Sequence, residues 1–235
     1  MRQLTLFGDL ILTPRANIDE ARELLESLKA EGIVIGTDEA GRGALAGPVI
    51  AAAVYLTQEQ EEKLLANKLR DSKKLTQKSR EKIFTLMNEL GVLWSASPGS
   101  IDLIESRNIL RTSLYAMAQS VNKLVNKLAL DPVCVIVDGN ARIPEINFPQ
   151  WTLIRADNLV PVVSAASIVA KVIRDRLMHN LDSKYPGYDL TKNKGYPTKM
   201  HIERIKSHGI CDIHRESFCR KFLQAKLGDD AKCQP

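Results

Sequence analysis

The chain has 235 residues, of which 44% are hydrophobic and 26% charged, as in an ordinary globular protein with one large domain. No apolar run approaches the roughly 18 residues of a membrane span, and the start of the chain is too interrupted for a signal peptide. We therefore expect a cytoplasmic protein that does not enter a membrane, and we expect it to be a monomer. The net charge of +5 favours a polyanionic partner.

Cysteines and basic residues are unevenly distributed. The 4 cysteines predict no disulfide framework in a chain of this size. His208, Cys211, His214 and Cys219 lie close enough to suggest a zinc site, but their spacing fits no common zinc finger, so incidental thiols are the favoured interpretation. Basic residues crowd the last fifth of the chain and a second group near residue 75, which suits either solvated faces or a nucleic-acid surface.

Hydrophobic periodicity predicts the elements of the first half of the chain. The expected order is a loose tail over 1–15, a helix near 18–30, strands at 33–38 and 48–56, helices at 58–68 and 76–90, and a strand at 92–97. The two early strands are rich in Val, Ile and Ala, which favours burial. Thr76 is a candidate N-cap for the second of the paired helices.

Strands and helices alternate in the second half. The expected order is a long helix near 108–128, strands at 133–140 and 151–157, and helices at 164–181, 198–207 and 216–227. Small residues on one face of the helix at 164–181 favour close packing. Strands followed by strand–helix alternation indicate an α/β fold with a mixed sheet covered by helices.

Acidic side chains follow three of the expected strands. They are Asp38 with Glu39, Asp138 and Asp157. A single acid at such a position is more often a cap or a turn former, but four from three strands are hard to explain in that way. If the strands are neighbours, the carboxylates converge at the ligand-binding edge of the sheet and repel one another unless divalent cations neutralise them. Mg²⁺ or Mn²⁺ suits such oxygen ligands, which predicts a metal-dependent phosphoryl-transfer enzyme.

The glycines after the first strand offer a competing interpretation. Gly41, Gly43 and Gly47 form a loose dinucleotide-binding pattern. That pattern needs a helix that opens within the glycines, whereas Pro48 here begins another expected strand. The neighbouring acids would also repel a pyrophosphate. A nucleotide cofactor is therefore disfavoured.

The stretch "GTDEAGRGALAGPV" (36–49) resembles a known family. Its acidic pair followed by Ala-Gly-Arg-Gly resembles the opening motif of ribonuclease HII, the prokaryotic type 2 ribonuclease H. Further matches occur in order at "DSKKLT" (71–76), "NILRTSLYAM" (108–117), "VDGN" (137–140), "ADNLVPVVSAASIVAKVIRD" (156–175), "KGYPT" (194–198) and "HGICDIHRESF" (208–218). The resemblance covers residues 32–225 of the chain.

For the fold, the resemblance implies a ribonuclease H-like domain with a mixed five-stranded central sheet and a short C-terminal helical extension. We expect an N-terminal tail and helix over 1–31, a catalytic domain over 32–183 and a substrate-binding extension over 184–235.

For the activity, the resemblance implies an endoribonuclease that cleaves the RNA strand of RNA–DNA hybrids and cuts at single ribonucleotides in duplex DNA. The cut falls on the 5′ side of the ribonucleotide and leaves 3′-hydroxyl and 5′-phosphate ends. The family's metal-binding acids fall on Asp38, Glu39, Asp138 and Asp157, which would hold two Mg²⁺ or Mn²⁺ ions.

For recognition, the resemblance implies that Gly41, Arg42 and Gly43 read the ribose 2′-hydroxyl chiefly through the backbone, and that Tyr196 packs by the next sugar. These roles are physically reasonable, because the 2′-hydroxyl distinguishes RNA from DNA and glycine permits a close backbone approach. Candidate phosphate contacts are Lys73, Lys74 and Lys171, although solvated lysines explain them equally well.

The tail holds a second motif, "QLTLF", outside the resemblance. Gln3, Leu4, Leu6 and Phe7 look like the short peptide by which bacterial proteins dock on the DNA polymerase sliding clamp. A glutamine followed by apolar anchors suits insertion into a preformed groove. A tail segment that packs on the body of the protein is the alternative.

Three other functions stay open. A non-catalytic hybrid-binding module of the same fold leaves four convergent acids unexplained. A transposase or resolvase of the ribonuclease H-like group does not account for Gly-Arg-Gly together with Tyr196. Ribonuclease HIII is disfavoured because the fourth acid is Asp157 and the Gly-Arg-Gly segment is intact.

Overall fold

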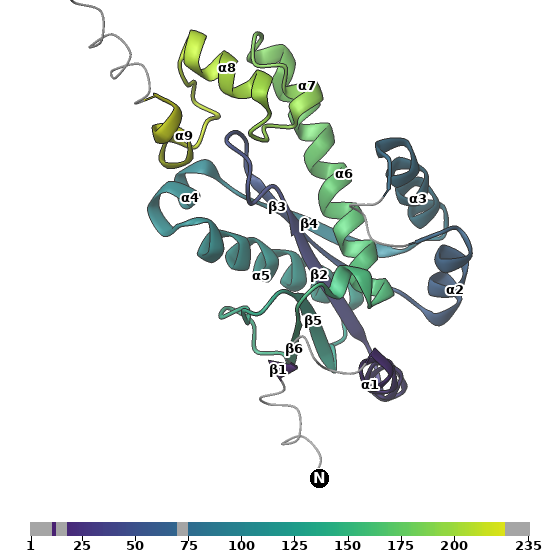
Figure 1. The fold of residues 1–235 in the computed structure, drawn as a ribbon. Helices are drawn as coiled ribbons and strands as arrows, with labels where there is room; N and C mark the ends of the chain where they lie inside the picture. Colours follow the sequence, from purple (N-terminus) through teal and green to yellow (C-terminus); the bar gives the residue numbers. More distant parts are fainter. Residues whose placement is uncertain (1–10, 13–17, 70–74, 224–235) are drawn as a thin grey trace, which may run out of the picture.

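The computed structural model describes residues 11–12, 18–69 and 75–223. A mixed sheet of strand order β1-β6-β5-β2-β3-β4 forms its centre, with helices on both faces (Figure 1). The strands are β1 (Ile11–Leu12), β2 (Val34–Ala40), β3 (Val49–Tyr55), β4 (Leu93–Gly99), β5 (Cys134–Asp138) and β6 (Gln150–Leu153). The expected α/β class, a mixed sheet flanked by helices, is confirmed.

Most of the helices follow the sequence pattern, but two short ones, at 101–107 and 190–193, were not expected. The helices are α1 (Ile18–Glu31), α2 (Gln58–Ala66), α3 (Gln77–Glu89), α4 (Ile101–Arg107), α5 (Ile109–Leu128), α6 (Pro161–Lys184), α7 (Leu190–Asn193), α8 (Lys199–His208) and α9 (Glu216–Leu223), with a 3₁₀ turn η2 at Ala156–Asn158. Thr76 caps α3 as expected, since its hydroxyl accepts a hydrogen bond from the Ser79 amide at 3.2 Å.

Alternation along the strands separates two hydrophobic layers. On β2, Val34 faces a cluster that includes residues of α1, α2, α3 and α6, whereas Ile35 faces a cluster built largely on α5. The long helices α5 and α6 therefore cover opposite faces of the sheet (Figure 1). Ala and Ser residues of α6 allow it to lie close to β2, so the expected role of its small face is confirmed.

Strand direction brings three strand ends to one edge of the sheet. β2 is antiparallel to β3 but parallel to β5, and β5 is parallel to β6. Thr37 pairs with Val137, so the residues that follow on the two strands are Asp38 and Asp138. The carboxyl ends of parallel strands form the usual ligand-binding edge of an α/β sheet.

One predicted strand is too long. The strand expected over 151–157 ends at Leu153, because Arg155 adopts a left-handed conformation with φ of 60° and the chain then enters η2. Asp157 thus lies in a 3₁₀ turn and not at the end of a strand. The following helix begins at Pro161, where a missing amide proton costs nothing in the first helical turn.

The prediction of a loose tail over 1–15 is wrong at two residues. Ile11 and Leu12 pair in parallel with Thr152 and Leu153, so that β1 extends the five-stranded core of the sheet at the β6 edge. Unpaired backbone groups at a sheet edge readily accept such a short strand.

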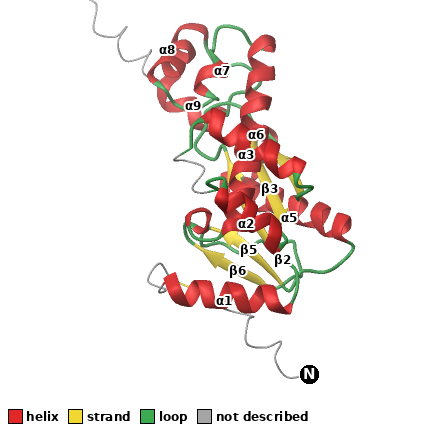
Figure 2. Cartoon of the chain, turned by 90° about the vertical axis from the view of Figure 1, so that its right-hand side faces the viewer, coloured by secondary structure: helices red, strands yellow, loops and turns green. Residues whose placement is uncertain are grey.

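The helices α7, α8 and α9 lie at the end of the molecule opposite α1 (Figure 2). They form a separate hydrophobic cluster with Met178 of α6 and with Leu45 and Ala46 of the β2–β3 loop. The division at 1–31, 32–183 and 184–235 stays a prediction. No helix within the described ranges is long and apolar enough to span a membrane.

The close approach of α6 to β2 yields a stability prediction. A Cβ atom on Gly36 would lie 2.6 Å from the carbonyl carbon of Val162 and 2.7 Å from the Val163 amide nitrogen, both of them backbone atoms. Because neither can move aside cheaply, Gly36→Ala should lower the free energy of unfolding by about 3 kcal/mol.

Urea denaturation followed by circular dichroism measures this loss. Gly43→Ala is the matched control, since a Cβ there meets nothing within 4 Å. Equal stability of the two variants would contradict the predicted clash.

Candidate active site

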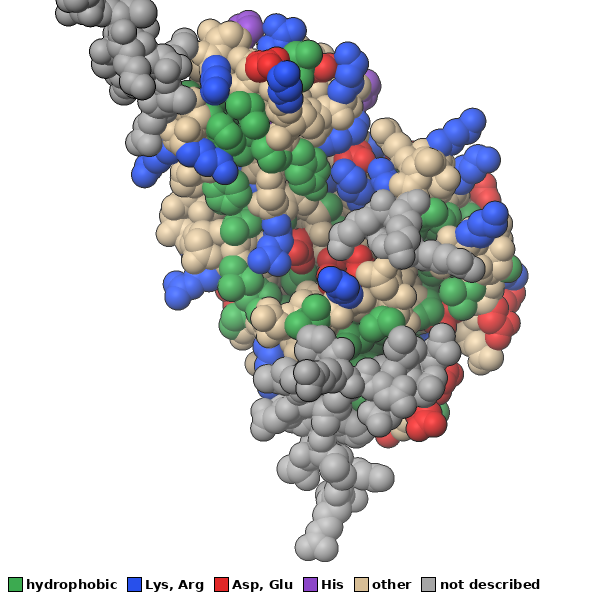
Figure 3. Space-filling model, in the orientation of Figure 1, with side chains coloured by type: hydrophobic (Ala, Val, Ile, Leu, Met, Phe, Trp, Pro, Cys, Tyr) green, Lys and Arg blue, Asp and Glu red, His purple; other side chains and the backbone are tan. Residues whose placement is uncertain are grey.

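A cavity of about 480 Å³ opens at the carboxyl end of β2. Asp38, Glu39 and Asp138 line its acidic side, and Arg80 and Lys171 line its basic side. The segment 41–43 and Tyr196 complete the lining. Figure 3 shows acidic side chains near the centre of this view of the molecule, with basic side chains around them. Groups of both charge signs thus line one cavity.

Asp38 is the most strongly perturbed of the acids. It is only 4% exposed, and burial raises its pKa well above the usual value, with a further rise from the charges of Glu39 and Asp138. Hydrogen bonds from the Ser167 hydroxyl and the Glu39 amide act in the opposite direction. The carboxylates of β2 and β5 are therefore close enough to repel one another, as the sequence predicts.

The other acids are held by specific contacts. The Glu39 carboxylate forms an ion pair with Arg42 at 3.3 Å, and the Asp138 carboxylate accepts a hydrogen bond from the Ala156 amide at 2.7 Å. Asp157 follows that amide directly, is fully buried and accepts a hydrogen bond from the Asn158 side chain at 2.9 Å. Three of the four predicted acids line the cavity. Asp157 does not line it, but it is the next residue after Ala156, whose amide contacts Asp138.

The chemistry of these groups suits a hard divalent cation. Carboxylate oxygens are the preferred ligands of Mg²⁺ and Mn²⁺. Burial is the main cause of the raised pKa of Asp38, and a cation would relieve the repulsion by Glu39 and Asp138 that adds to it. Within the described part of the chain, no three His, Cys, Asp or Glu side chains are already arranged as a complete ligand set. The acids therefore match the predicted metal in ligand chemistry, and Asp38, Glu39 and Asp138 line one cavity, but their use as metal ligands stays a prediction.

The suggested zinc ligands do not come together as one group. The Cys211 sulfur lies 3.2 Å from Nδ1 of His214, but His208 hydrogen bonds to Ser207 and Cys219 is buried against the Leu45 carbonyl.

The two elements predicted to read the sugar face the same cavity. Gly41 has a φ of 99°, which favours glycine, and space is open around Gly43. Two cations lie over the Tyr196 ring, Nζ of Lys171 at 5.2 Å and the guanidinium carbon of Arg174 at 5.1 Å from its centre. The loop 41–43 and the loop that carries Tyr196 are thus brought together from distant parts of the sequence.

Asp175 organises the basic side of the cavity. This buried carboxylate accepts a hydrogen bond from Lys171 at 2.7 Å and forms an ion pair with Arg80 at 3.7 Å. Sequence reasoning identified Lys171 but missed Arg80 and Ser167 as lining residues. The basic group near residue 75 was the available signal for Arg80. Lys73 and Lys74, with Gln3, Leu4, Leu6 and Phe7 of the tail motif, lie outside the described residues.

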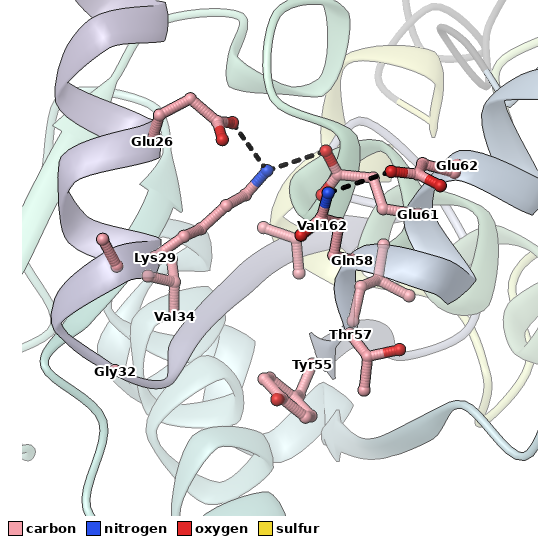
Figure 4. Close-up of a pocket in the computed structure, with 12 residues that line it drawn as sticks. Glu26, Lys29, Gly32, Val34, Tyr55, Thr57, Gln58, Glu61, Glu62 and Val162 are labelled. Carbon is pink, nitrogen blue, oxygen red and sulfur yellow. Dashed lines mark hydrogen bonds and ion pairs between the residues drawn. The ribbon is translucent and has the colours of Figure 1, made fainter.

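A second cavity of about 490 Å³ lies at the other end of β2, between α1 and α2 (Figure 4). Its polar groups bond to one another: Lys29 contacts Glu26 at 3.0 Å and Glu61 at 2.7 Å, and Gln58 contacts Glu62 at 3.0 Å. With three acids against one lysine, it would repel a polyanion. The cavity at the carboxyl end of β2 is therefore the stronger candidate.

The chain resembles known proteins over most of its length. Residues 35–221 match the family model of ribonuclease HII. The ribonuclease HII of Caldicellulosiruptor saccharolyticus is 42% identical over 204 residues, which cover 86% of this chain and 95% of that protein.

Solved structures agree with this similarity. The ribonuclease H2 of Pyrococcus horikoshii OT3 has a TM-score of 0.64 and 26% identity, and the match covers 83% of this chain and 99% of that one. The ribonuclease HII in a complex with PCNA from Archaeoglobus fulgidus has a TM-score of 0.61 and 25% identity, covering 86% and 98% of the two chains. The fold is thus ribonuclease H-like, and the chain belongs to the ribonuclease HII family of nucleases.

Proposed function

We propose that the protein is an endoribonuclease that hydrolyses the RNA strand of RNA–DNA hybrids and incises duplex DNA on the 5′ side of embedded ribonucleotides. The observation that carries the proposal is the single cavity that Asp38, Glu39 and Asp138 line together with the glycine segment 41–43 and Tyr196. The acids suit phosphodiester chemistry, and the glycine segment and Tyr196 suit recognition of a sugar. Membership of the ribonuclease HII family supports both roles.

The acids have the role of metal ligands in this proposal. Asp38, Glu39, Asp138 and Asp157 would hold two Mg²⁺ or Mn²⁺ ions together with the scissile phosphate. When bound, such ions supply an activated water and stabilise the leaving oxygen. The Ser167 hydroxyl and the Glu39 amide favour the ionised form of Asp38, which a metal ligand must adopt.

The basic side of the cavity would position the backbone of the nucleic acid. The buried Asp175 carboxylate forms ion pairs with both Lys171 and Arg80. These pairs hold the two positive charges at the cavity, where they would meet the phosphates. Phosphate contacts of this kind set register and affinity without reading sequence.

The glycine segment and Tyr196 would supply the selection for RNA. A backbone without a Cβ atom can approach the 2′-hydroxyl closely at Gly43, where space is open. An aromatic ring packed on the adjacent sugar would then fix which residue of the strand lies over the acids. The chain would thereby recognise a ribonucleotide without recognising its base.

Cleavage of a duplex DNA that carries one ribonucleotide tests the proposal. With Mg²⁺ or Mn²⁺ we expect a single cut on the 5′ side of the ribonucleotide, and with chelator no cut, because the acids alone would repel the phosphate. Denaturing gels of end-labelled strands measure both. Metal-independent cleavage would contradict the proposed chemistry, and binding without cleavage under any metal would favour the non-catalytic module.

Asp138→Asn should bind the duplex but lower the cleavage rate by at least about 100-fold, because the neutral amide is a poor ligand for a divalent ion. Single-turnover rates and a filter-binding measurement separate the two effects. Asp131→Asn is the matched control, since Asp131 is exposed and precedes the other end of the same strand. Equal cleavage rates for the two variants would show that Asp138 is not a metal ligand.

We propose further that the tail motif binds the DNA polymerase sliding clamp. Gln3, Leu4, Leu6 and Phe7 provide a glutamine with apolar anchors, and the A. fulgidus neighbour was solved in complex with PCNA. Deletion of residues 2–8 should abolish clamp binding in surface plasmon resonance and leave cleavage of short duplexes unchanged, because the motif lies outside the resemblance to the catalytic domain. Unchanged clamp binding would contradict this role.

A further inference from the structure

Two arginines are fully buried in the wall behind the candidate active site. Arg174 of α6 and Arg215 before α9 each have no exposed surface. Burial of an unpaired charge costs several kcal/mol in general. Each guanidinium hydrogen bonds to backbone carbonyls, so its interactions stabilise particular loop conformations.

Arg174 joins two loops that are far apart in the sequence. Its Nε donates to the Pro48 carbonyl at 3.1 Å and its Nη2 to the Ala46 carbonyl at 3.1 Å. Its Nη1 donates to the Lys194 carbonyl at 2.8 Å. One planar group thus connects the loop after β2 with the loop that leads to Tyr196.

The same side chain touches both elements proposed to read the sugar. Its guanidinium carbon lies 5.1 Å from the centre of the Tyr196 ring, within cation–π range. A Cβ atom on Gly41 would collide with Nε of Arg174, so the Gly41 backbone rests directly on this side chain. A movement of the Arg174 side chain would therefore disturb its contact with the Tyr196 ring, its contact with Gly41, or both.

Arg215 also hydrogen bonds to the loop after β2. Its Nη1 donates to the Arg42 carbonyl at 2.9 Å, and its Nε and Nη2 donate to the Gly47 carbonyl at 3.0 and 2.8 Å. The two loops also meet directly, since the Leu45 amide donates to the Gly195 carbonyl at 2.7 Å. Backbone contacts of this density leave little freedom between the glycine segment and Tyr196.

We propose that Arg174 is a positioning residue that holds Tyr196 in fixed relation to Gly41–Gly43, with Arg215 as a second support, so that ring and backbone meet adjacent sugars of one strand. This role rests on the proposed function, because it concerns the recognition of a ribonucleotide. Lysine cannot replace Arg174, since its single ammonium group cannot reproduce three donors in a rigid plane.

A double-mutant cycle between Arg174→Lys and Tyr196→Ala tests the role. The substrate is duplex DNA with one ribonucleotide, and kcat, KM and the duplex dissociation constant are measured for the wild type, both single variants and the double variant. If Arg174 acts through Tyr196, Arg174→Lys lowers kcat about 100-fold with little change in duplex binding, because misplacement of about 1 Å costs that much in alignment. In the Tyr196→Ala background the same change should then cost less than about 3-fold.

Arg176→Lys is the matched control. Arg176 lies on the same helix, forms an ion pair with Glu81 and packs over Phe84 at 4.9 Å, but its side chain is 53% exposed and does not line the cavity. Its substitution should leave kcat within about 2-fold of the wild type in either background.

Several outcomes would overturn the role. Additive losses in the cycle, or a wild-type kcat for Arg174→Lys, would show that Arg174 does not act through Tyr196, while the proposed function would stand. A wild type that does not cut the duplex would overturn both. Thermal unfolding is recorded for each variant, and if Arg174→Lys does not fold, Arg215→Lys takes its place in the cycle with the same expected coupling.

Discussion

The parallel pairing of β2 with β5 is the constraint on which the candidate site depends. Because Thr37 lies opposite Val137, the next residue of each strand delivers a carboxylate to the same edge of the sheet. Glu39 adds a third charge at that edge, and burial of Asp38 makes the repulsion between them stronger. A one-residue shift in register would turn these side chains to opposite faces of the sheet.

The rest of the cavity compensates for this concentration of negative charge. Lys171 and Arg80 oppose the acids, and Asp175 holds both of them in place without entering the cavity lining. Farther back, Arg174 and Arg215 place two more positive charges under the loops that flank the acids. Backbone carbonyls accept the hydrogen bonds of these guanidinium groups, and the charges of Asp175 and Glu105 act on Arg174 and Arg215, respectively. The site thus combines an acidic centre with a positively charged support.

Local patterns in the sequence are sufficient to identify the central strands, the long helices and the acidic residues. Apolar runs that end in acids mark β2 and β5, and helical periodicity marks α5. The short helices α4 and α7 were missed, since each is too brief for a periodic signal. The sequence predicts Asp157 at a strand end, because an arginine at position 155 gives no indication of the left-handed conformation that ends the strand early.

The sequence alone determined which residues are candidates for chemistry, because carboxylates after buried strands follow from local composition and the resemblance to ribonuclease HII adds the glycines beside them. Only the tertiary structure decided which of them share a cavity and what holds them there. Ser167, Arg80 and Arg174 contribute through contacts with residues far away in the sequence, 128 positions in the case of Arg174 and Ala46, and such contacts have no signature in a local window. The physical reason is that strand register and the packing of α6 on the sheet, not the neighbouring residues in the chain, place these side chains.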